Sequence, residues 1–519
     1  MGRGLGNVNE RGRGRWLVGR VPPGLCFVVV AGVVAGLVGV GCGSAARGLG
    51  ASGAERVITY ASALAVLVCC TVALVHRGYH AGWFHPLSLP LALIAVMSLA
   101  APCWVYFTHE SVGLIYATGY APVDGSDLDV ALSVSACLAL ALVVCGYMIG
   151  AATVLIVATA PAQRTKFERH TGLTDVASLR YRSARRAGMV LMWLAGMAQV
   201  FAAALERGTP YGVNQFQYGV PAILAPAAAS ALLGGLIVTQ VASCRLSMPR
   251  SFREILGGVG PWFALGTYLV AVALTGGRGG LIPPLVYLGW AYSLKVHRIS
   301  LMRMAIVLGV GIVIASVVVS YRDGTGLAPG SPVAIAQDTV DSVSSSAWLT
   351  EQTVLRVPEE VGYMHGSTYL AAVEAQLPGP LSRATGAPNR TASAVFRDII
   401  DYNNPDQGFA ESLPSEAYLN FGLIGCAGAG LVLGLIMGLA WVASEENKWS
   451  SREVWYGVLL AGLMTGFRAD AVAQIKDILY PMLVVWVLLA WCRVAPGGTE
   501  DLRLGWDEDA AGRFVLRRR

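Results

Sequence analysis

The sequence predicts an all-α polytopic membrane protein with about twelve transmembrane helices and one large extracytoplasmic loop. Composition is the first indication, since 55% of the residues are hydrophobic, 13% are charged and the mean hydropathy is +0.57. A soluble domain is typically about a quarter charged. The apolar residues also form long blocks, and many of these can cross a hydrocarbon core about 30 Å thick. Lysine and arginine, finally, are distributed unevenly among the segments that join the blocks.

The apolar blocks place predicted spans along the whole chain. A cluster of arginines precedes the first block, which is long and has no convincing cleavage site, so we expect a retained signal anchor. The spans before the large loop are predicted at 23–42, 57–75, 86–107, 130–157, 188–205, 220–242, 256–275, 281–294 and 304–320. Those after it are predicted at 417–441, 453–467 and 477–492.

The charge distribution orients these spans. With both termini in the cytoplasm, most of the 38 Lys and Arg residues fall in cytoplasmic segments, as the positive-inside rule requires. Segment 164–186 is the richest in arginine, and its expected role is to set topology and to bind lipid headgroups. The predicted organisation is a cytoplasmic tail (1–22), spans (23–320), an outer loop (321–416), spans (417–492) and a cytoplasmic tail (493–519).

The outer loop is long enough to be functional rather than a simple connection. Its aromatic and aliphatic residues cluster at 346–356, 368–377 and 395–402, so we expect short helices there, packed over the outer mouth of the bundle. The ten cysteines lie within or at the ends of apolar blocks, with neither a CxxC pair nor a Cys/His cluster. We therefore predict no disulfide, metal site or cofactor. No nucleic-acid partner is expected.

Several charged residues are expected at the outer surface. Arg278 lies in a hairpin flanked by glycines, which let the backbone approach a ligand, and its guanidinium can bind two phosphate oxygens at once. Arg322 follows the ninth span, and Arg468 and Asp470 lie between two short apolar blocks. Ionisable groups close to the bilayer are costly, which makes these residues candidates for substrate binding. Alternatively, each arginine contacts lipid headgroups or pairs with a neighbouring acid.

The candidates for proton transfer are Glu411, Glu416 and His365. Pro414 and Ser415 predict the start of a helix, and Glu411 lies just outside it, where a carboxylate could accept a proton from a sugar hydroxyl. Glu416 lies in the first turn, so its alternative role is to complement the helix dipole. His365 lies in the loop and is either a base or an ordinary surface residue.

Segments in this region resemble one known family. They are Gly366-Ser-Thr-Tyr-Leu370, Leu377-Pro-Gly-Pro380 and the stretch from Glu411 through Asn420-Phe-Gly422. In this order they resemble the large periplasmic loop of Wzy-type oligosaccharide repeat-unit polymerases, the O-antigen polymerase family. That loop has a G-x-x-Y-L segment, a proline-containing segment and an E-x-Y-x-N-F-G helix entrance. The Gly-Arg-Gly hairpin at 277–279 and the Arg-x-Asp at 468–470 are also similar to family features, so the resemblance covers roughly residues 256–485.

The resemblance implies a GT-C-like fold and a metal-independent glycosyltransferase of the bacterial cytoplasmic membrane. Such an enzyme transfers a growing glycan from undecaprenyl diphosphate to the sugar of another lipid-linked repeat unit, and the product is a capsule, an exopolysaccharide or O-antigen. The arginines would hold the diphosphate, while a carboxylate or histidine would activate the acceptor hydroxyl. Some members also have R-x10-G motifs. Here nine residues separate Arg356 from Gly366, so this candidate for substrate binding departs from that pattern.

The implied partners are the polyprenyl-diphosphate-linked oligosaccharide, the bilayer, a flippase and a chain-length regulator. Three alternatives stay open. An O-antigen ligase has the same architecture but transfers finished glycan to another acceptor. A lipid-linked oligosaccharide transporter usually has ionisable residues within its spans, and the predicted spans contain no Lys or Arg. A polyprenyl-phosphate mannosyltransferase would have an acidic pair in the first outer loop, where Glu55 is the only acid.

Overall fold

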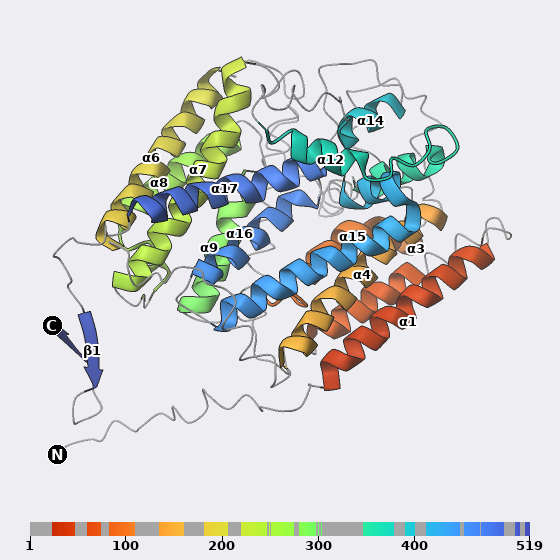
Figure 1. Ribbon diagram of the computed structural model, residues 1–519, viewed down its shortest axis with the longest axis horizontal. Coiled ribbons are helices and arrows are strands. Elements are labelled where there is room, and N and C mark those ends of the chain that lie inside the picture. Colours follow the sequence, from red (N-terminus) through yellow and green to blue (C-terminus); the bar gives the residue numbers. More distant parts are fainter. Residues whose placement is uncertain are drawn as a thin grey trace.

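The protein is a bundle of helices (Figure 1). The computed structural model describes residues 23–46, 60–73, 83–108, 134–159, 181–205, 219–246, 249, 251–274, 280–296, 299, 303, 346–377, 390–399, 412–446, 451–467, 469–492, 504–508 and 514–518. Within these ranges the bundle is entirely helical, and strands occur only in a C-terminal hairpin.

Two groups of helices pack on either side of a central pair (Figure 1). The first group is α1 (Pro23–Ala46), α3 (Leu89–Thr108), α4 (Val134–Thr159) and α15 (Leu413–Glu446). The second is α6 (Tyr181–Leu205), α7 (Gly219–Leu246), α8 (Val259–Leu274) and α17 (Ala471–Trp491), with the 3-10 helix η4 (Phe252–Leu256) between α7 and α8. The central pair is α9 (Ile282–Lys295) and α16 (Ser451–Gly466), which contact each other and join the two groups.

Each predicted span coincides with a helix, apart from 304–320, which lies outside the described residues. Within the described part of the chain, five helices are long and apolar enough to cross a membrane. They are α4, α6, α7, α15 and α17. Shorter apolar helices occur within α1, α3, α8 and α16 and at residues 60–73. A multi-pass membrane protein is therefore confirmed by the fold.

Three helices begin four or more residues before the spans predicted from hydropathy. α6 starts at Tyr181 rather than 188, α15 at Leu413 rather than 417, and α17 at Ala471 rather than 477. Hydropathy marks only the part of a helix that lies in hydrocarbon, whereas backbone hydrogen bonds continue the helix into polar surroundings. Lys476, predicted to precede the last span, and Asp477, its predicted first residue, consequently lie within α17 and not at its start.

Glycines allow α4 and α15 to approach closely. A Cβ atom on Gly430 would overlap the carbonyl oxygen of Val143, and one on Gly146 would overlap the carbonyl oxygen of Ala427. Helices in a membrane associate mainly through such close packing, because lipid tails are as apolar as the side chains between them. This contact makes α4 and α15 the centre of the first group.

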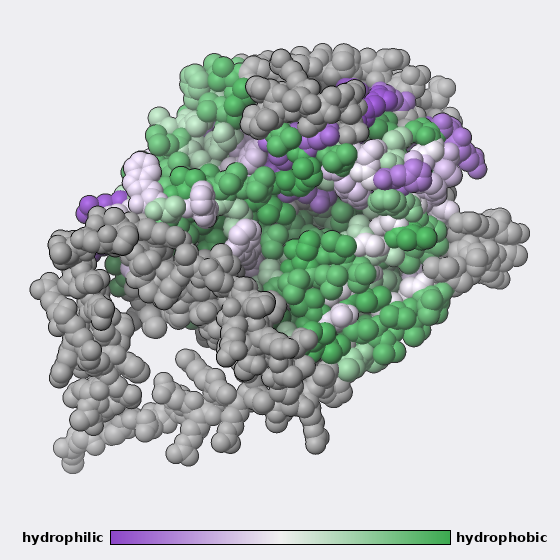
Figure 2. Space-filling view, in the orientation of Figure 1, coloured by the Kyte–Doolittle hydropathy of each residue, from purple (hydrophilic) through white to green (hydrophobic). Residues whose placement is uncertain are grey.

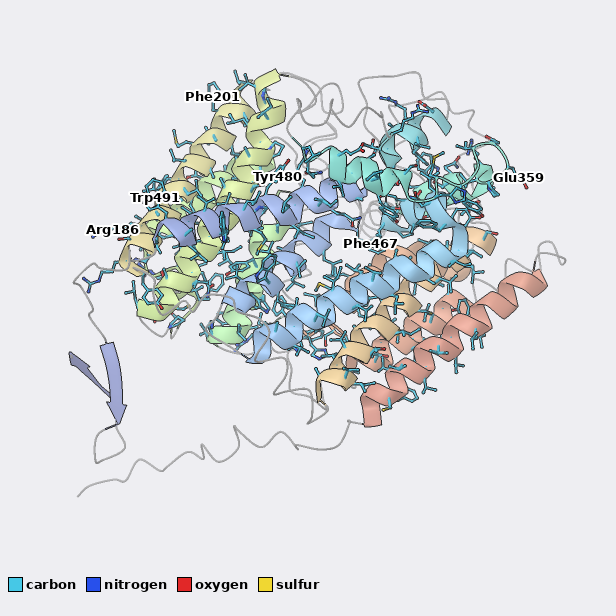
Figure 3. The ribbon with its side chains drawn as sticks, in the orientation of Figure 1. Arg186, Phe201, Glu359, Phe467, Tyr480 and Trp491 are labelled. Carbon is cyan, nitrogen blue, oxygen red and sulfur yellow. The ribbon has the colours of Figure 1, made fainter. Side chains whose placement is uncertain are left out.

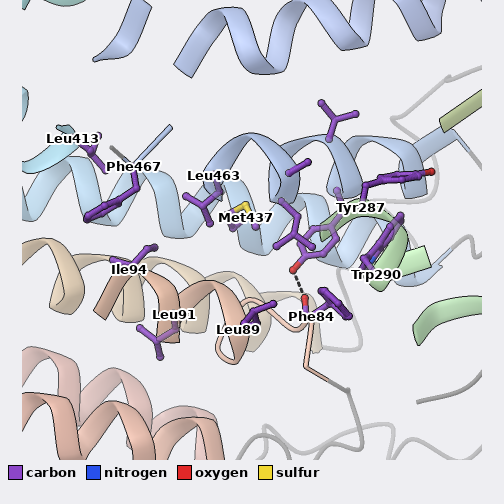
Figure 4. Packing of buried hydrophobic residues seen from close by; sticks show 14 of the residues in the cluster. Phe84, Leu89, Leu91, Ile94, Tyr287, Trp290, Leu413, Met437, Leu463 and Phe467 are labelled. Carbon is purple, nitrogen blue, oxygen red and sulfur yellow. Dashed lines mark hydrogen bonds between the residues drawn. The ribbon is translucent and has the colours of Figure 1, made fainter. Parts of the chain in front are cut away.

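At one end of the bundle, aromatic side chains fix the segment that precedes α3 (Figure 4). The Tyr456 hydroxyl of α16 donates a hydrogen bond to the carbonyl oxygen of Phe84, and the Tyr147 hydroxyl of α4 donates one to that of Pro86 at 3.0 Å. The rings of His85 and Trp441 meet edge to face, with centroids 5.2 Å apart. Chain segments from α3, α4, α15 and α16 are thus held together at this end.

The opposite end carries short helices (Figure 1). A helix over residues 346–356, α12 (Ser367–Glu374) and α14 (Ala392–Ile399) fall in the three clusters where short helices are expected. Figure 2 shows hydrophilic residues gathered over this end and hydrophobic residues along α15 and α1. At the C-terminus, β1 (Leu504–Glu508) and β2 (Phe514–Arg518) form an antiparallel hairpin that the sequence analysis does not predict.

Candidate functional site

Three motifs that are far apart in the sequence meet at the end that carries the short helices. Gly366 and Thr368 come from the G-x-x-Y-L segment at the start of α12, and Glu416 and Asn420 come from the first turns of α15. Asp470 is the N-cap of α17. Hydrogen bonds connect these segments directly, and we refer to Thr368, Glu416, Asn420 and Asp470 as the motif junction.

Glu416 lies at the centre of the motif junction and is 1% exposed. Its Oε1 atom accepts a hydrogen bond from the Thr368 hydroxyl at 2.8 Å, and its Oε2 atom accepts one from the backbone nitrogen of Ala471 at 2.6 Å. Ala471 is the first residue of α17, so the carboxylate lies at the positive end of that helix dipole. Glu416 thus connects α12, α15 and α17.

Asn420 completes the connection between α12 and α15. Its Oδ1 atom accepts from the backbone nitrogen of Gly366 at 2.8 Å. Its Nδ2 atom donates to the Thr368 hydroxyl at 2.7 Å and to the Glu416 carbonyl oxygen at 2.8 Å. Gly366 has a φ of 90°, a left-handed conformation that favours glycine. This explains why the G-x-x-Y-L segment begins with glycine: the turn presents its N–H to Asn420.

A kink separates the motif junction from the long apolar part of α15. Gly422 has a φ of 64° and a ψ of −150°, which are non-helical values. A Cβ atom at this position would lie 2.9 Å from the hydroxyl oxygen of Tyr363, so the glycine also permits close packing. The final glycine of the E-x-Y-x-N-F-G motif therefore produces a kink in α15. Residues 413–421 form a short helical segment on one side of this kink.

Asp470 has both carboxylate oxygens engaged. Oδ1 accepts from the backbone nitrogen of Ala473 at 3.1 Å, which caps α17, and Oδ2 accepts from the Ser393 hydroxyl of α14 at 2.7 Å. On the other side of residue 468, the carbonyl oxygen of Phe467 accepts from the backbone nitrogen of Leu413 at 3.3 Å. The chain is thus anchored on both sides of the Arg-x-Asp motif, to α14 and to the start of α15.

His365 and Arg356 lie beside the motif junction. His365 is exposed, has a φ of 48°, and donates its backbone N–H to the Asn420 carbonyl oxygen at 3.1 Å. Its ring lies 6.4 Å from that of Tyr363. Arg356 is half-buried and donates to the Gln352 side chain of its own helix at 2.5 Å. Of these two, His365 is the one whose side chain faces solvent.

The remaining predicted site residues lie outside the described part of the chain. They are Glu411, Arg278, Arg322 and Arg468. For two of them, the structure describes the residues next to them in the sequence. Arg468 stands in the sequence between the anchored residues Phe467 and Asp470, and Glu411 immediately precedes Ser412, which is buried. The roles of these four residues stay predictions.

Sequence reasoning missed Thr368 and Asn420 as members of the site. Both lie inside the motifs that carry the family resemblance, and Asn420 follows Glu416 by one helical turn, which was a usable signal. Glu351 was also missed. It is 1% exposed on the helix over residues 346–356, whose Thr353 hydroxyl lies 2.6 Å from that of Ser415 on α15. Glu351 and Arg356 are the only charged residues of this helix, and Glu351 is the buried one, which indicates a buried polar site.

Electrostatically, the motif junction is a buried region that contains two carboxyl groups, those of Glu416 and Asp470. Burial, together with the neighbouring Glu416 carboxylate, raises the pKa of Tyr369 above its usual value. Among the described residues, no three His, Cys, Asp or Glu side chains lie together as metal ligands would. Chemically, the arrangement fixes helix ends and loops rigidly around a polar surface, which is a suitable scaffold for residues that bind a charged substrate.

The apolar helices and the polar end define the class: a multi-pass membrane protein with a polar site at one end of the bundle. Residues 264–494, which contain the whole motif junction, match the family of O-antigen polysaccharide polymerase Wzy. The match confirms the resemblance to the Wzy-type family that the motifs indicate. No curated protein and no solved structure gives a significant match. Together the family and the helices support a multi-pass protein of the bacterial inner membrane.

Proposed function

We propose that this protein polymerises undecaprenyl-diphosphate-linked oligosaccharide repeat units on the outer side of the bacterial cytoplasmic membrane. The family match supports repeat-unit polymerisation by a glycosyltransferase-type enzyme. The observation that carries the proposal is the motif junction, because three segments that resemble the family's periplasmic loop and its flanks form one hydrogen-bonded unit. A surface polysaccharide such as a capsule or an exopolysaccharide is the proposed product.

In the proposed reaction, a hydroxyl oxygen of the acceptor repeat unit attacks the anomeric carbon of the donor glycan. The bond from that carbon to the diphosphate oxygen breaks, and undecaprenyl diphosphate leaves with the electron pair. The acceptor proton passes to a base. Charge therefore develops on the diphosphate, which guanidinium groups stabilise. We assign this role to Arg278, Arg322 and Arg468, with Arg356 as a further contact to the substrate.

We rank the candidates for the base by their burial and hydrogen bonds. Both Glu416 oxygens accept hydrogen bonds from protein groups and the residue is buried, so it has no free oxygen directed at solvent. We therefore propose that Glu416 positions α12 and α17, while His365 or Glu411 accepts the proton. His365 is supported by its exposure next to the motif junction. Asp470 is proposed as a positioning residue for the turn that contains Arg468, since both its oxygens bind the chain.

Transfer from lipid-linked repeat units tests the proposal. The purified protein is incubated with undecaprenyl-diphosphate-linked repeat units extracted from cells in which its gene is deleted, and products are resolved by length. A ladder of polymers is expected. Absence of any transfer by folded protein would reject polymerase activity. Transfer of one glycan to an acceptor that carries no polyprenyl chain would identify a ligase instead.

Arg278 variants test the assignment of the diphosphate contact in the same assay. Arg278→Ala should abolish the ladder, and Arg278→Lys should restore little of it, because an ammonium group lacks the planar two-point contact of guanidinium. The matched control is Arg390→Gln. Arg390 is an arginine of the large loop, between α12 and α15, and it is 57% exposed and pairs with Asp398, so its loss should leave the ladder intact. Full activity of folded Arg278→Ala protein would exclude Arg278.

A further inference from the structure

A second cluster of polar groups lies at the end of α6, α7 and α8 away from the motif junction. Figure 3 shows Arg186 of α6 and Trp491, the last residue of α17, toward the same side, whereas Phe467, four residues before α17, lies toward the motif junction. Within α6, α7, η4 and α8, Glu254 is the only acidic residue. The basic residues are Arg182, Arg185, Arg186, Arg245 and Arg253. This end therefore attracts anions.

Two hydrogen-bond donors converge on the loop that leads into α8. A Cβ atom on Gly257 would lie 2.6 Å from the Ser243 hydroxyl oxygen and 3.1 Å from the Arg185 Nη1 atom. Both side chains therefore face the same side of this glycine, whose φ of 69° is a left-handed value. Residue 257 must be glycine, because any side chain would collide with both donors and strain the backbone.

The Ser243 hydroxyl is an orphan within the described residues. It is buried, with 1% of Ser243 exposed, and it has no hydrogen-bond partner there. A buried polar group without a partner costs free energy, roughly 1–3 kcal/mol, and so indicates a binding partner of complementary chemistry. Because the hydroxyl is directed at Gly257, that partner would lie at the entrance to α8.

The entrance to α8 is itself suited to an anion. Gly258 precedes the first residue, Val259, and has no side chain that could cap the first turn. The N–H groups of Val259 and Gly260 are the donors at this position, because Pro261 has none. A Cβ atom on Gly258 would meet nothing within 4 Å, which leaves open space at this position. A helix N-terminus with open space, an arginine and a serine hydroxyl beside it has the donors that a phosphate group requires.

We propose that Arg185, Ser243 and the N-terminus of α8 form a binding site for a phosphate group, and that the ligand is the headgroup of an anionic phospholipid. The surrounding side chains favour a lipid over free phosphate. Phe252 (47% exposed), Val259 (44%) and Phe263 (66%) present apolar surface next to the site, where acyl chains would lie. Trp262, whose indole nitrogen donates to the Arg253 carbonyl oxygen at 3.0 Å, also lies beside the site, and tryptophan is enriched at membrane interfaces. The site is independent of the proposed polymerase activity.

Lipid binding to the full-length protein in a neutral detergent tests this site. Phosphatidylglycerol, phosphatidylcholine and inorganic phosphate are titrated separately, and retained lipid is counted by native mass spectrometry while the unfolding midpoint is recorded. Phosphatidylglycerol should bind more tightly than phosphatidylcholine and raise the midpoint. If inorganic phosphate displaces phosphatidylglycerol at equal concentration, the phosphate site is supported but its ligand is free phosphate and not a lipid. Equal binding of the two lipids with no effect of phosphate would overturn the site.

Matched variants locate the binding. Arg185→Gln should weaken phosphatidylglycerol binding about tenfold or more, and Ser243→Ala severalfold, because each removes a donor to a charged group. The controls are Arg182→Gln, an exposed arginine one turn earlier, and Thr239→Val, which removes another buried hydroxyl without a described partner one turn from Ser243. Both controls should bind as the wild type does. If Arg182→Gln and Arg185→Gln weaken phosphatidylglycerol binding equally, the lipid is attracted by the net positive charge of this end and there is no defined site.

Discussion

The Oε2 atom of Glu416 lies 2.6 Å from the backbone nitrogen of Ala471 and accepts its hydrogen bond across 55 positions of the sequence. The first turn of α15 is thereby joined to the first turn of α17. The Asp470 side chain caps the same helix by accepting a hydrogen bond from the backbone nitrogen of Ala473. Two carboxylates therefore accept hydrogen bonds from the N-terminus of α17. The arrangement holds Asp470 and Ala471 close to the E-x-Y-x-N-F-G motif, which is how two family-like segments come to lie together.

The first prediction distinguishes a positioning role of Glu416 from a catalytic one. Glu416→Gln keeps the shape and an acceptor for Ala471 and removes a charge whose burial is itself unfavourable, so the unfolding free energy should change by less than about 1 kcal/mol. Repeat-unit transfer should fall by no more than about tenfold. Glu416→Ala leaves both donors unpaired and should reduce protein yield and transfer together. Complete loss of transfer in Glu416→Gln with an unchanged unfolding midpoint would show that the carboxylate is the base.

The second prediction concerns the close contact of α4 and α15. Gly430→Ala places a methyl group against the Val143 carbonyl oxygen and should lower the unfolding free energy by about 1–3 kcal/mol. Gly428→Ala is the control on the same helix, because a Cβ atom there meets nothing within 4 Å. It should be neutral or slightly stabilising, since alanine favours helix. Unfolding midpoints in detergent measure both variants, and equal midpoints would contradict the packing argument.

The third prediction is a pH dependence of stability at His85. Burial lowers the pKa of this residue from 6.5 to about 3, and its Nδ1 atom accepts from the backbone nitrogen of Leu87 at 3.2 Å. The unfolded chain therefore binds a proton first as the pH falls. Stability should decrease as the pH drops from about 6.5 toward 3, by up to ~1.4 kcal/mol per unit.

His85→Asn is the matched variant for this test. Its side-chain oxygen can accept from Leu87 but it does not titrate. Unfolding midpoints are compared between pH 7.5 and pH 5, within the range in which only the unfolded histidine gains a proton. The wild type should lose more stability than His85→Asn over this interval. Identical pH profiles would show that another group controls the dependence.

The fourth prediction is the orientation in the membrane. Cysteines are introduced singly at Val340 and Asp175 in a background without the native cysteines. A membrane-impermeant thiol reagent applied to intact spheroplasts should label position 340, in the large loop, and should not label position 175 until the membrane is opened. The reason is the concentration of Lys and Arg in segments such as 164–186. Reversed labelling would place the motif junction in the cytoplasm and overturn the proposed reaction with it.

The positions of the apolar helices in the described part of the chain were predictable from the sequence by itself. Transfer of apolar side chains into hydrocarbon is a sum of local contributions, so a block such as 130–157 indicates α4 without knowledge of its neighbours. The order of the motifs was also visible, and it indicated the family that residues 264–494 match. The sequence also placed Glu416 in the first turn of a helix, and the structure confirms this.

Only the tertiary structure decided which groups these motifs contact. The sequence suggested that Glu416 complements the dipole of its own helix, but its Oε2 atom binds the start of α17, and Thr368 and Asn420 entered the site through the same network. The orphan hydroxyl of Ser243 beside Gly257 was likewise invisible in the sequence. Hydrogen bonds act over about 3 Å and depend on direction, so they follow from how distant helices pack, whereas hydropathy and net charge act residue by residue along the chain.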